Sequence, residues 1–312
     1  MINNNLDLDI REVESKDVSE LVPFFNSGIY YPPYKTPEIL RWWILESLIP
    51  VITYCAFYND EIVGTFSVFK RKLTNNLNCG ILMGLVVKKE FRGTAIFRIL
   101  GEKAMNKFED MDLFICLPNM NGAKALEKNF NFKTIGKVET MINSDIRNIN
   151  GKECTIEIID HRTKYHCIKQ KTEKFIMFES DYKFWKWKYA IHPIFTHNIF
   201  YFSKEEYIII KIFTDEDNGK KFGDIVDYVI PSLDKEGIYN LLSNACSNIN
   251  RLDLDVITIQ ALPNSLLHYV AKEMGFKSSK HHHHFCLKVK DKRHNYLFEP
   301  KNWTIKWGDY LR

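Results

Sequence analysis

The chain has 312 residues, which is more than one typical domain needs and enough for two. Its 43 lysines and arginines nearly balance its 39 aspartates and glutamates, and no basic stripe is present, so the composition argues against a nucleic-acid partner. Seven scattered cysteines without a CxxC pair argue against a disulfide framework and favour a reducing, cytoplasmic location. The longest apolar stretch, residues 48–58, is too short to cross a bilayer, and the polar N-terminal residues lack the pattern of a signal peptide, so we expect no membrane partner.

The first half alternates helical and strand patterns in a fixed order. TPEILRWWILES predicts a helix, and residues 51–72 predict a hairpin with its turn at Asn59-Asp60. NCGILMGLVV predicts the next strand, and residues 96–108 form an amphipathic helical pattern. A short apolar strand then ends in Leu-Pro-Asn, whose Asn119 is expected to cap another helix, and a last strand begins at Phe132.

The second half repeats this order at an offset of about 143 positions. Pro50 corresponds to Pro193, and a second Leu-Pro-Asn ends at Asn264, also expected to be a helix cap. Residues 153–160 add one strand candidate between the halves. We therefore expect an α/β protein of two tandem domains, each a mixed twisted sheet flanked by helices: residues 1–150, a connector over 151–180, and residues 181–312.

A candidate anion site follows the strand that ends at Val87. Arg92-Gly93-Thr94-Ala95 opens the next helix, whose first backbone N–H groups and dipole favour a negative ligand. Small residues let a phosphate approach the backbone, and Arg92 adds a positive charge. This strand, turn and helix suit a diphosphate.

The segment LMGLVVKKEFRGTAIFRILGEKAM resembles motif A of the GCN5-related N-acetyltransferases, and LPNMNGAKALEKNFNFK resembles the strand, helix and final strand that follow it. The resemblance implies that acetyl-CoA or another acyl-CoA is the co-substrate, bound by the first half without a metal ion. The residues that it implies for the pyrophosphate are Arg92, Gly93, Thr94, Ala95, Ile96 and Phe97. Those implied for the pantetheine and thioester are Leu85, Val86 and Val87. Asn121 is expected either on the pantetheine arm or as another helix cap or a surface residue.

The sequence departs from the family pattern at three places. Ala95 and Phe97 stand at positions that are usually small, and Asn131 replaces the usual glycine before Phe132. Glu127 occupies the position of the family's general-acid tyrosine. We therefore expect Glu127 to be the catalytic acid, with a solvated helix residue as the alternative for this position and His192 and Asp309 as the other candidates for proton transfer.

The second half has lost the phosphate loop. The corresponding residues begin at Lys235, and Asp234 and Glu236 would repel a diphosphate. We expect one CoA per chain and a degenerate acetyltransferase-like C-terminal domain that shapes the acceptor site.

Aromatic residues and histidines supply the other candidates. Tyr30, Tyr31 and Tyr34 are expected to line the acceptor pocket, with a core position as the alternative. The four histidines of residues 281–284 alternate faces if they form a strand, which is poor geometry for a metal ion.

We interpret the chain as an acyl-CoA-dependent N-acyltransferase that transfers an acyl group, most simply acetyl, to a small-molecule primary amine by direct attack. The closing residues 303–312 resemble a bacterial subgroup linked to surface-sugar biosynthesis, which implies an amino sugar or its nucleotide-linked form as acceptor. A non-catalytic acyl-CoA or sugar binding protein and an acyl-carrier-protein donor stay open. The acceptor, the acyl length and the oligomeric state are not set by the sequence.

Overall fold

The computed structural model describes residues 7–28, 35–145, 149–165, 170, 175–216 and 218–309. The first half contains β1 (Asp9–Glu12), α1 (Val18–Gly28), α2 (Pro37–Leu40), β2 (Val51–Tyr58), β3 (Glu61–Lys72), β4 (Asn78–Val87), α3 (Ile96–Asn106), β5 (Leu113–Cys116), α4 (Met120–Phe130) and β6 (Lys133–Asn143). The second contains β7 (Thr155–Ile158), α5 (Tyr182–Trp185), β8 (Thr196–Ser203), β9 (Glu206–Thr214), β10 (Lys221–Val229), α6 (Lys235–Ile249), β11 (Val256–Ala261), α7 (Leu266–Glu273) and β12 (Lys277–Val289).

Short helical turns complete the described chain. The π-helical turns η2 (Arg41–Leu45) and η4 (Lys186–Ala190) continue α2 and α5. The 3₁₀ turns are η1 (Ser15–Asp17), η3 (Lys89–Phe91), η5 (Asn250–Leu252), η6 (Lys292–Phe298), η7 (Pro300–Asn302) and η8 (Trp307–Asp309). None of the helices in the described residues is long and apolar enough to cross a bilayer.

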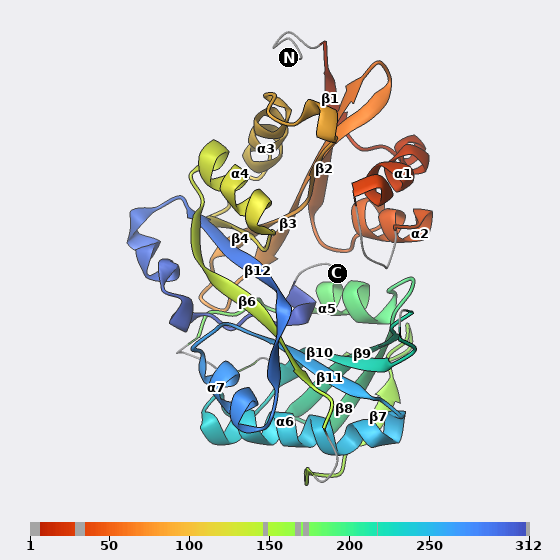
Figure 1. The fold of residues 1–312 in the computed structure, drawn as a ribbon, viewed down its shortest axis with the longest axis vertical. Coiled ribbons are helices and arrows are strands. Elements are labelled where there is room, and N and C mark those ends of the chain that lie inside the picture. Colours follow the sequence, from red (N-terminus) through yellow and green to blue (C-terminus); the bar gives the residue numbers. More distant parts are fainter. Residues whose placement is uncertain are drawn as a thin grey trace.

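The strands form one continuous mixed sheet in the order β1-β2-β3-β4-β5-β12-β6-β11-β10-β9-β8-β7 (Figure 1). The last strands of the two halves are exchanged: β12 pairs with β5 and β6, and β6 pairs with β11. The sequence predicted a separate sheet for each half. The expected division into residues 1–150 and 181–312 divides the chain into two halves, but strands from both halves belong to the same sheet.

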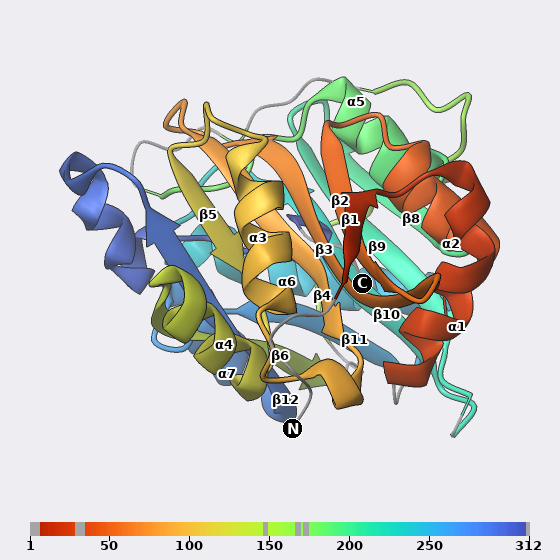
Figure 2. The same cartoon turned by 90° about the horizontal axis from the view of Figure 1, so that it is seen from above.

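Helices cover both faces of the sheet (Figures 1 and 2). In the first half α3 and α4 pack on one face against side chains such as Leu82 and Phe114. The adjacent Ile81 and Ile115 point to the other face, toward α1 and α2. This alternation follows from the two-residue period of a strand. In the second half α6 and α7 cover one face, and α5 lies on the same side as α1 and α2.

Local sequence signals account for several turns and caps. Asn59 and Asp60 both have positive φ, as the predicted β2–β3 turn requires. The side chain of Asn119 accepts from the Gly122 N–H at 2.9 Å and caps α4, as predicted. The same prediction for Asn264 is wrong, because Ser265 caps α7 instead.

Candidate active site

The site begins where β4 and β5 separate. These parallel strands pair only over Cys79–Ile81 and Leu113–Ile115, and β4 then continues to Val87 without β5 beside it. A bulge helps to turn β4 at Gly84, which has a φ of +61° and whose carbonyl accepts from the Thr65 hydroxyl at 2.6 Å. A Cβ at Gly84 would come within 2.9 Å of the Trp43 ring, so this position requires glycine.

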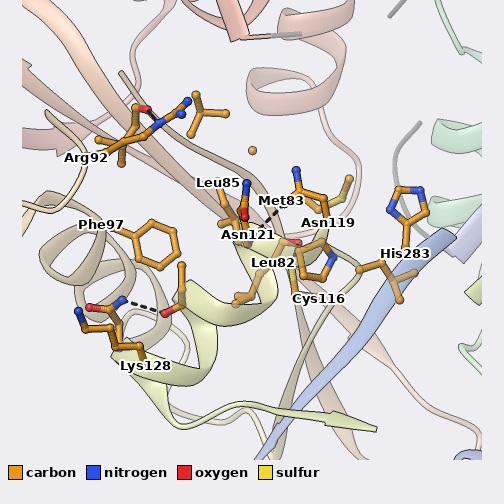
Figure 3. Close-up of a pocket in the computed structure, with 18 of the residues that line it drawn as sticks. Leu82, Met83, Leu85, Arg92, Phe97, Cys116, Asn119, Asn121, Lys128 and His283 are labelled. Carbon is orange, nitrogen blue, oxygen red and sulfur yellow. Dashed lines mark hydrogen bonds between the residues drawn. The ribbon is translucent and has the colours of Figure 1, made fainter. Parts of the chain in front are cut away.

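A cavity of about 720 Å³ occupies this opening (Figure 3). That volume lies in the usual range for small-molecule sites, about 300–1,000 Å³. The structure brings eight of the predicted CoA-binding residues together in its lining: Leu85, Val86, Val87, Arg92, Gly93, Thr94, Phe97 and Asn121. Ala95 and Ile96 do not line it. Ala95 is the N-cap of α3, and Ile96 is buried in the core below.

The loop before α3 presents open backbone donors to the cavity. Gly93 has a φ of +85°, which a glycine adopts without strain, and Thr94 turns its hydroxyl back to the Phe91 carbonyl at 2.7 Å. Ala95 provides no side-chain cap, and the Ile96 N–H reaches the Thr94 hydroxyl oxygen only at 3.4 Å. The first turn of α3 therefore keeps N–H groups that the helix itself does not bond and that can donate to a ligand. The exposed Arg92 donates from Nε to the Val87 carbonyl at 3.2 Å, which holds the guanidinium beside this loop.

Phe97, the least family-like residue of the loop, has a structural role. Its ring centroid lies 5.7 Å from that of Phe66 and 5.5 Å from that of Phe130. The side chain therefore anchors α3 to β3 and α4 while one edge borders the cavity. The bulky residue does not fill the space beside the helix N-terminus.

The predicted catalytic acid is not brought into the cavity. Glu127 is exposed on α4 and is not among the lining residues, so we do not retain it as the catalytic acid. Its helix presents Asn121, Ala125 and Lys128 to the cavity instead. Tyr30, Tyr31 and Tyr34 lie outside the described residues.

Sequence reasoning missed His283, which lines the cavity from β12. Figure 3 shows it at the end of the cavity opposite Arg92. The backbone N–H of His284 donates to the Pro118 carbonyl at 2.9 Å, which fixes this part of β12 against the end of β5. A strand from the second half thus contributes an imidazole to a cavity otherwise built by the first.

Cys116 lines the same cavity but is not a candidate nucleophile. Its Sγ donates to the Leu82 carbonyl at 3.4 Å across the strand opening. Burial raises the pKa of this thiol well above its ordinary value, which disfavours the reactive thiolate. Within the described residues, no group of three or more His, Cys, Asp or Glu side chains could hold a metal ion.

No family model matches the sequence, and no curated protein matches it. Solved structures do match in three dimensions. A GCN5-related N-acetyltransferase from Anabaena variabilis is 12% identical, with a TM-score of 0.64 over 91% of this chain and 73% of that one. A putative acetyltransferase from Pyrococcus horikoshii is 13% identical, with a TM-score of 0.61 over 99% and 96%. The chain has the fold of the GCN5-related N-acetyltransferases. Saccharomyces cerevisiae N-myristoyltransferase, solved with bound myristoylCoA, is 10% identical, with a TM-score of 0.60 over 90% of this chain and 82% of that one.

The second half of this acetyltransferase fold has a corresponding strand opening that is filled. β10 and β11 pair only over Phe222–Asp224 and Val256–Thr258, so these strands also separate. The cavity beyond them measures only about 30 Å³, and the buried Trp303 and Ile305 from the C-terminal segment help to close it. At the adjoining helix, the carboxylate of Asp234 already accepts from the Gly237 N–H at 2.8 Å.

Proposed function

We propose that the chain is an acyl-CoA-dependent N-acyltransferase whose first half binds the acyl-CoA. This proposal depends mainly on one observation: a continuous cavity joins the N-terminus of α3 to the place where β4 and β5 separate. The helix end supplies N–H donors and a favourable dipole for a diphosphate, and Arg92 adds positive charge. Leu85, Val86 and Val87 give the pantetheine arm an apolar wall with backbone groups that β5 does not pair.

Known structures support this proposal. The neighbours include proteins described as N-acetyltransferases and an N-myristoyltransferase with its acyl-CoA bound. We infer that an amine nitrogen attacks the thioester carbon directly: the new N–C bond forms, the C–S bond breaks, the amine loses a proton and the departing thiolate gains one.

We further propose that His283 donates the proton to the departing thiolate. Imidazole is the side chain whose ordinary pKa lies nearest neutral pH, which suits an acid that must be protonated and then regenerated. His283 lies away from the diphosphate loop, at the end of the cavity where a thioester would be placed. Holding amine and thioester together supplies the remaining acceleration.

The experiment combines binding with turnover. Calorimetry with acetyl-CoA measures complex formation, and release of free CoA is followed over a panel of primary amines that includes amino sugars, nucleotide-linked amino sugars and amino acids. Binding together with amine-dependent CoA release supports the proposal. Binding without turnover on any amine would instead support the non-catalytic binding protein, and no binding at all would remove the acyl-CoA assignment.

A further inference from the structure

A second, smaller cavity lies directly behind the cofactor cavity. Ile81 and Met83 of β4 line both, so the two spaces are separated by little more than these side chains. The far side of the small cavity is formed by Arg71 of β3, Lys188 of η4 and Asp309 of η8. Residues from both halves therefore meet next to the position expected for the reacting thioester.

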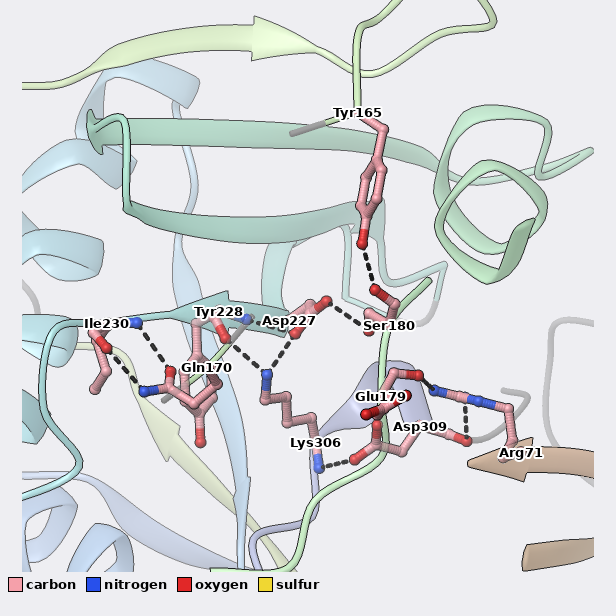
Figure 4. Close-up of polar contacts among 10 residues, drawn as sticks. All are labelled: Arg71, Tyr165, Gln170, Glu179, Ser180, Asp227, Tyr228, Ile230, Lys306 and Asp309. Atoms are coloured by element: carbon pink, nitrogen blue, oxygen red, sulfur yellow. Dashed lines mark hydrogen bonds and ion pairs between the residues drawn. The ribbon is translucent and has the colours of Figure 1, made fainter. Parts of the chain in front are cut away.

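Two buried ion pairs lie near this junction. The Lys306 ammonium lies 2.6 Å from the Asp227 carboxylate, and both side chains are buried (Figure 4). Lys211 and Asp224 form a second pair at 2.8 Å. Such pairing is the usual condition for burying a charge.

Arg71 is an exception among the described residues. Its side chain is buried, yet no carboxylate lies within ion-pair distance in the part of the chain described. The guanidinium donates to two neutral backbone carbonyls, those of Glu179 at 2.8 Å and Asp309 at 3.4 Å (Figure 4). It also stacks on the Phe184 ring at 3.4 Å. These bonds use two of its five N–H donors.

The surroundings of Arg71 disfavour positive charge. Burial lowers the pKa of Arg71, with the negative charge of Asp309 acting in the opposite direction. Across the cavity, burial together with Lys211, Arg71 and Lys35 lowers the pKa of Lys188 to about 7. The Asp309 carboxylate offsets the burial of Arg71 in part, and an anion bound beside Arg71 would offset it further.

We propose that this small cavity receives a carboxylate group of the acceptor, so that the enzyme acylates amines of the amino-acid class. The inference rests on the proposed function and deepens it. A guanidinium fork matches a carboxylate in shape and number of donors. The space measures only about 10 Å³, roughly one water molecule, so binding requires Met83 to move. Methionine is flexible enough to do so.

The test uses the wild-type chain with matched pairs of acceptors: leucine with isopentylamine, and phenylalanine with phenethylamine. The members of each pair differ only in the carboxylate. We expect kcat/KM to be about ten- to hundredfold higher for the amino acids, since a charge-assisted contact contributes roughly 1.5–3 kcal/mol. In the presence of CoA, N-acetylleucine is expected to bind by calorimetry and N-acetylisopentylamine much more weakly.

Arg71→Lys keeps the charge and removes the fork, and Arg98→Lys is the matched surface control. We expect Arg71→Lys to raise KM for leucine about tenfold or more with an unchanged Kd for acetyl-CoA. Equal kcat/KM values for the amines with and without the carboxylate overturn the inference and leave the proposed function intact. The same holds if acetyl-CoA binds while no amino acid or N-acetyl amino acid of the panel reacts or binds. Failure of acetyl-CoA binding overturns the proposed function itself.

Discussion

Trp42 and Trp187 exchange hydrogen bonds across the junction of the two halves. The indole Nε1 of each donates to the backbone carbonyl of the other, both at 2.9 Å, and the rings stack with centroids 4.5 Å apart. The two residues occupy the same place in their π-helical turns, η2 and η4. The pair thus marks a local two-fold relation between the halves.

Removing one indole donor is expected to weaken this junction. Trp187→Phe keeps an aromatic ring but leaves the buried Trp42 carbonyl without its partner, at a cost of about 1–3 kcal/mol. Urea unfolding of the wild type, Trp42→Phe, Trp187→Phe and the double variant measures this cost and the coupling free energy between the two indoles. Because the two indoles share one stack, we expect the double variant to lose less than the sum of the single variants. Strict additivity would show that the two bonds are independent.

The sequence repeat predicted the local elements better than their assembly. The single offset of 143 holds from β4 and β10 onward, but Trp42 and Trp187 are 145 positions apart. The second strand of the hairpin is shorter in the second half, with 9 residues in β9 against 12 in β3, so one offset could not align both parts. The exchange of β6 and β12 was not predictable, because strand order depends on pairing between segments distant in the chain.

Arg92→Ala is expected to weaken acetyl-CoA binding about ten- to hundredfold, because it removes a charge-assisted contact with the diphosphate. Arg98→Ala is the matched control, since Arg98 lies on α3 just after the loop, does not line the cavity and pairs with Glu102 at 3.2 Å. Calorimetry at low ionic strength gives both affinities. Equal affinities of the two variants would contradict the loop assignment.

One acetyl-CoA is expected per chain. Trp303 and Ile305 close the strand opening of the second half, and the Asp234 carboxylate already accepts a backbone N–H at the start of α6. A diphosphate there would meet a negative charge rather than open donors. A titration that saturates near one equivalent agrees with this structure, whereas two equivalents would show that the C-terminal segment leaves the second opening.

The geometry of the loop proposed to bind the diphosphate was predictable because its parts are contiguous in the sequence. Strand end, glycine and helix start lie within residues 87–97, and local geometry determines their arrangement. His283 was hidden for the opposite reason. The sequence predicted that neighbouring histidines would alternate between the two faces of a strand. Only the pairing of β12 with β5 brings the His283 imidazole to the cavity. Glu127 was assigned from its position in a motif, which does not determine where a helix directs that side chain.

His283→Gln is expected to lower kcat about 10²-fold, the usual scale for a lost acid–base group, with little change in acetyl-CoA affinity. Glutamine keeps polar atoms but cannot titrate. His282→Gln is the control, since His282 is adjacent on β12, exposed, and does not line the cavity. A leaving group that needs no protonation should restore the rate, so thioesters with more acidic thiols are expected to narrow the difference. A kcat within threefold of wild type would remove His283 from the mechanism.

Lys188→Met is expected to stabilise the fold in a pH-dependent way. Burial, followed by Lys211 and Arg71, lowers the pKa of Lys188 from 10.5 to about 7. Between these values the unfolded chain binds more protons than the folded one, so this lysine makes wild-type stability rise with pH, and its full penalty applies below pH 7. Urea unfolding should therefore show Lys188→Met to be more stable than wild type by a few kcal/mol at pH 6, with the difference shrinking toward pH 10. Lys306→Met is the contrasting control: it breaks the buried pair with Asp227 at 2.6 Å and should be destabilising at neutral pH. A Lys188→Met variant that is less stable than wild type at pH 6 would mean that the ammonium is stabilised in the folded protein, contrary to the expected direction.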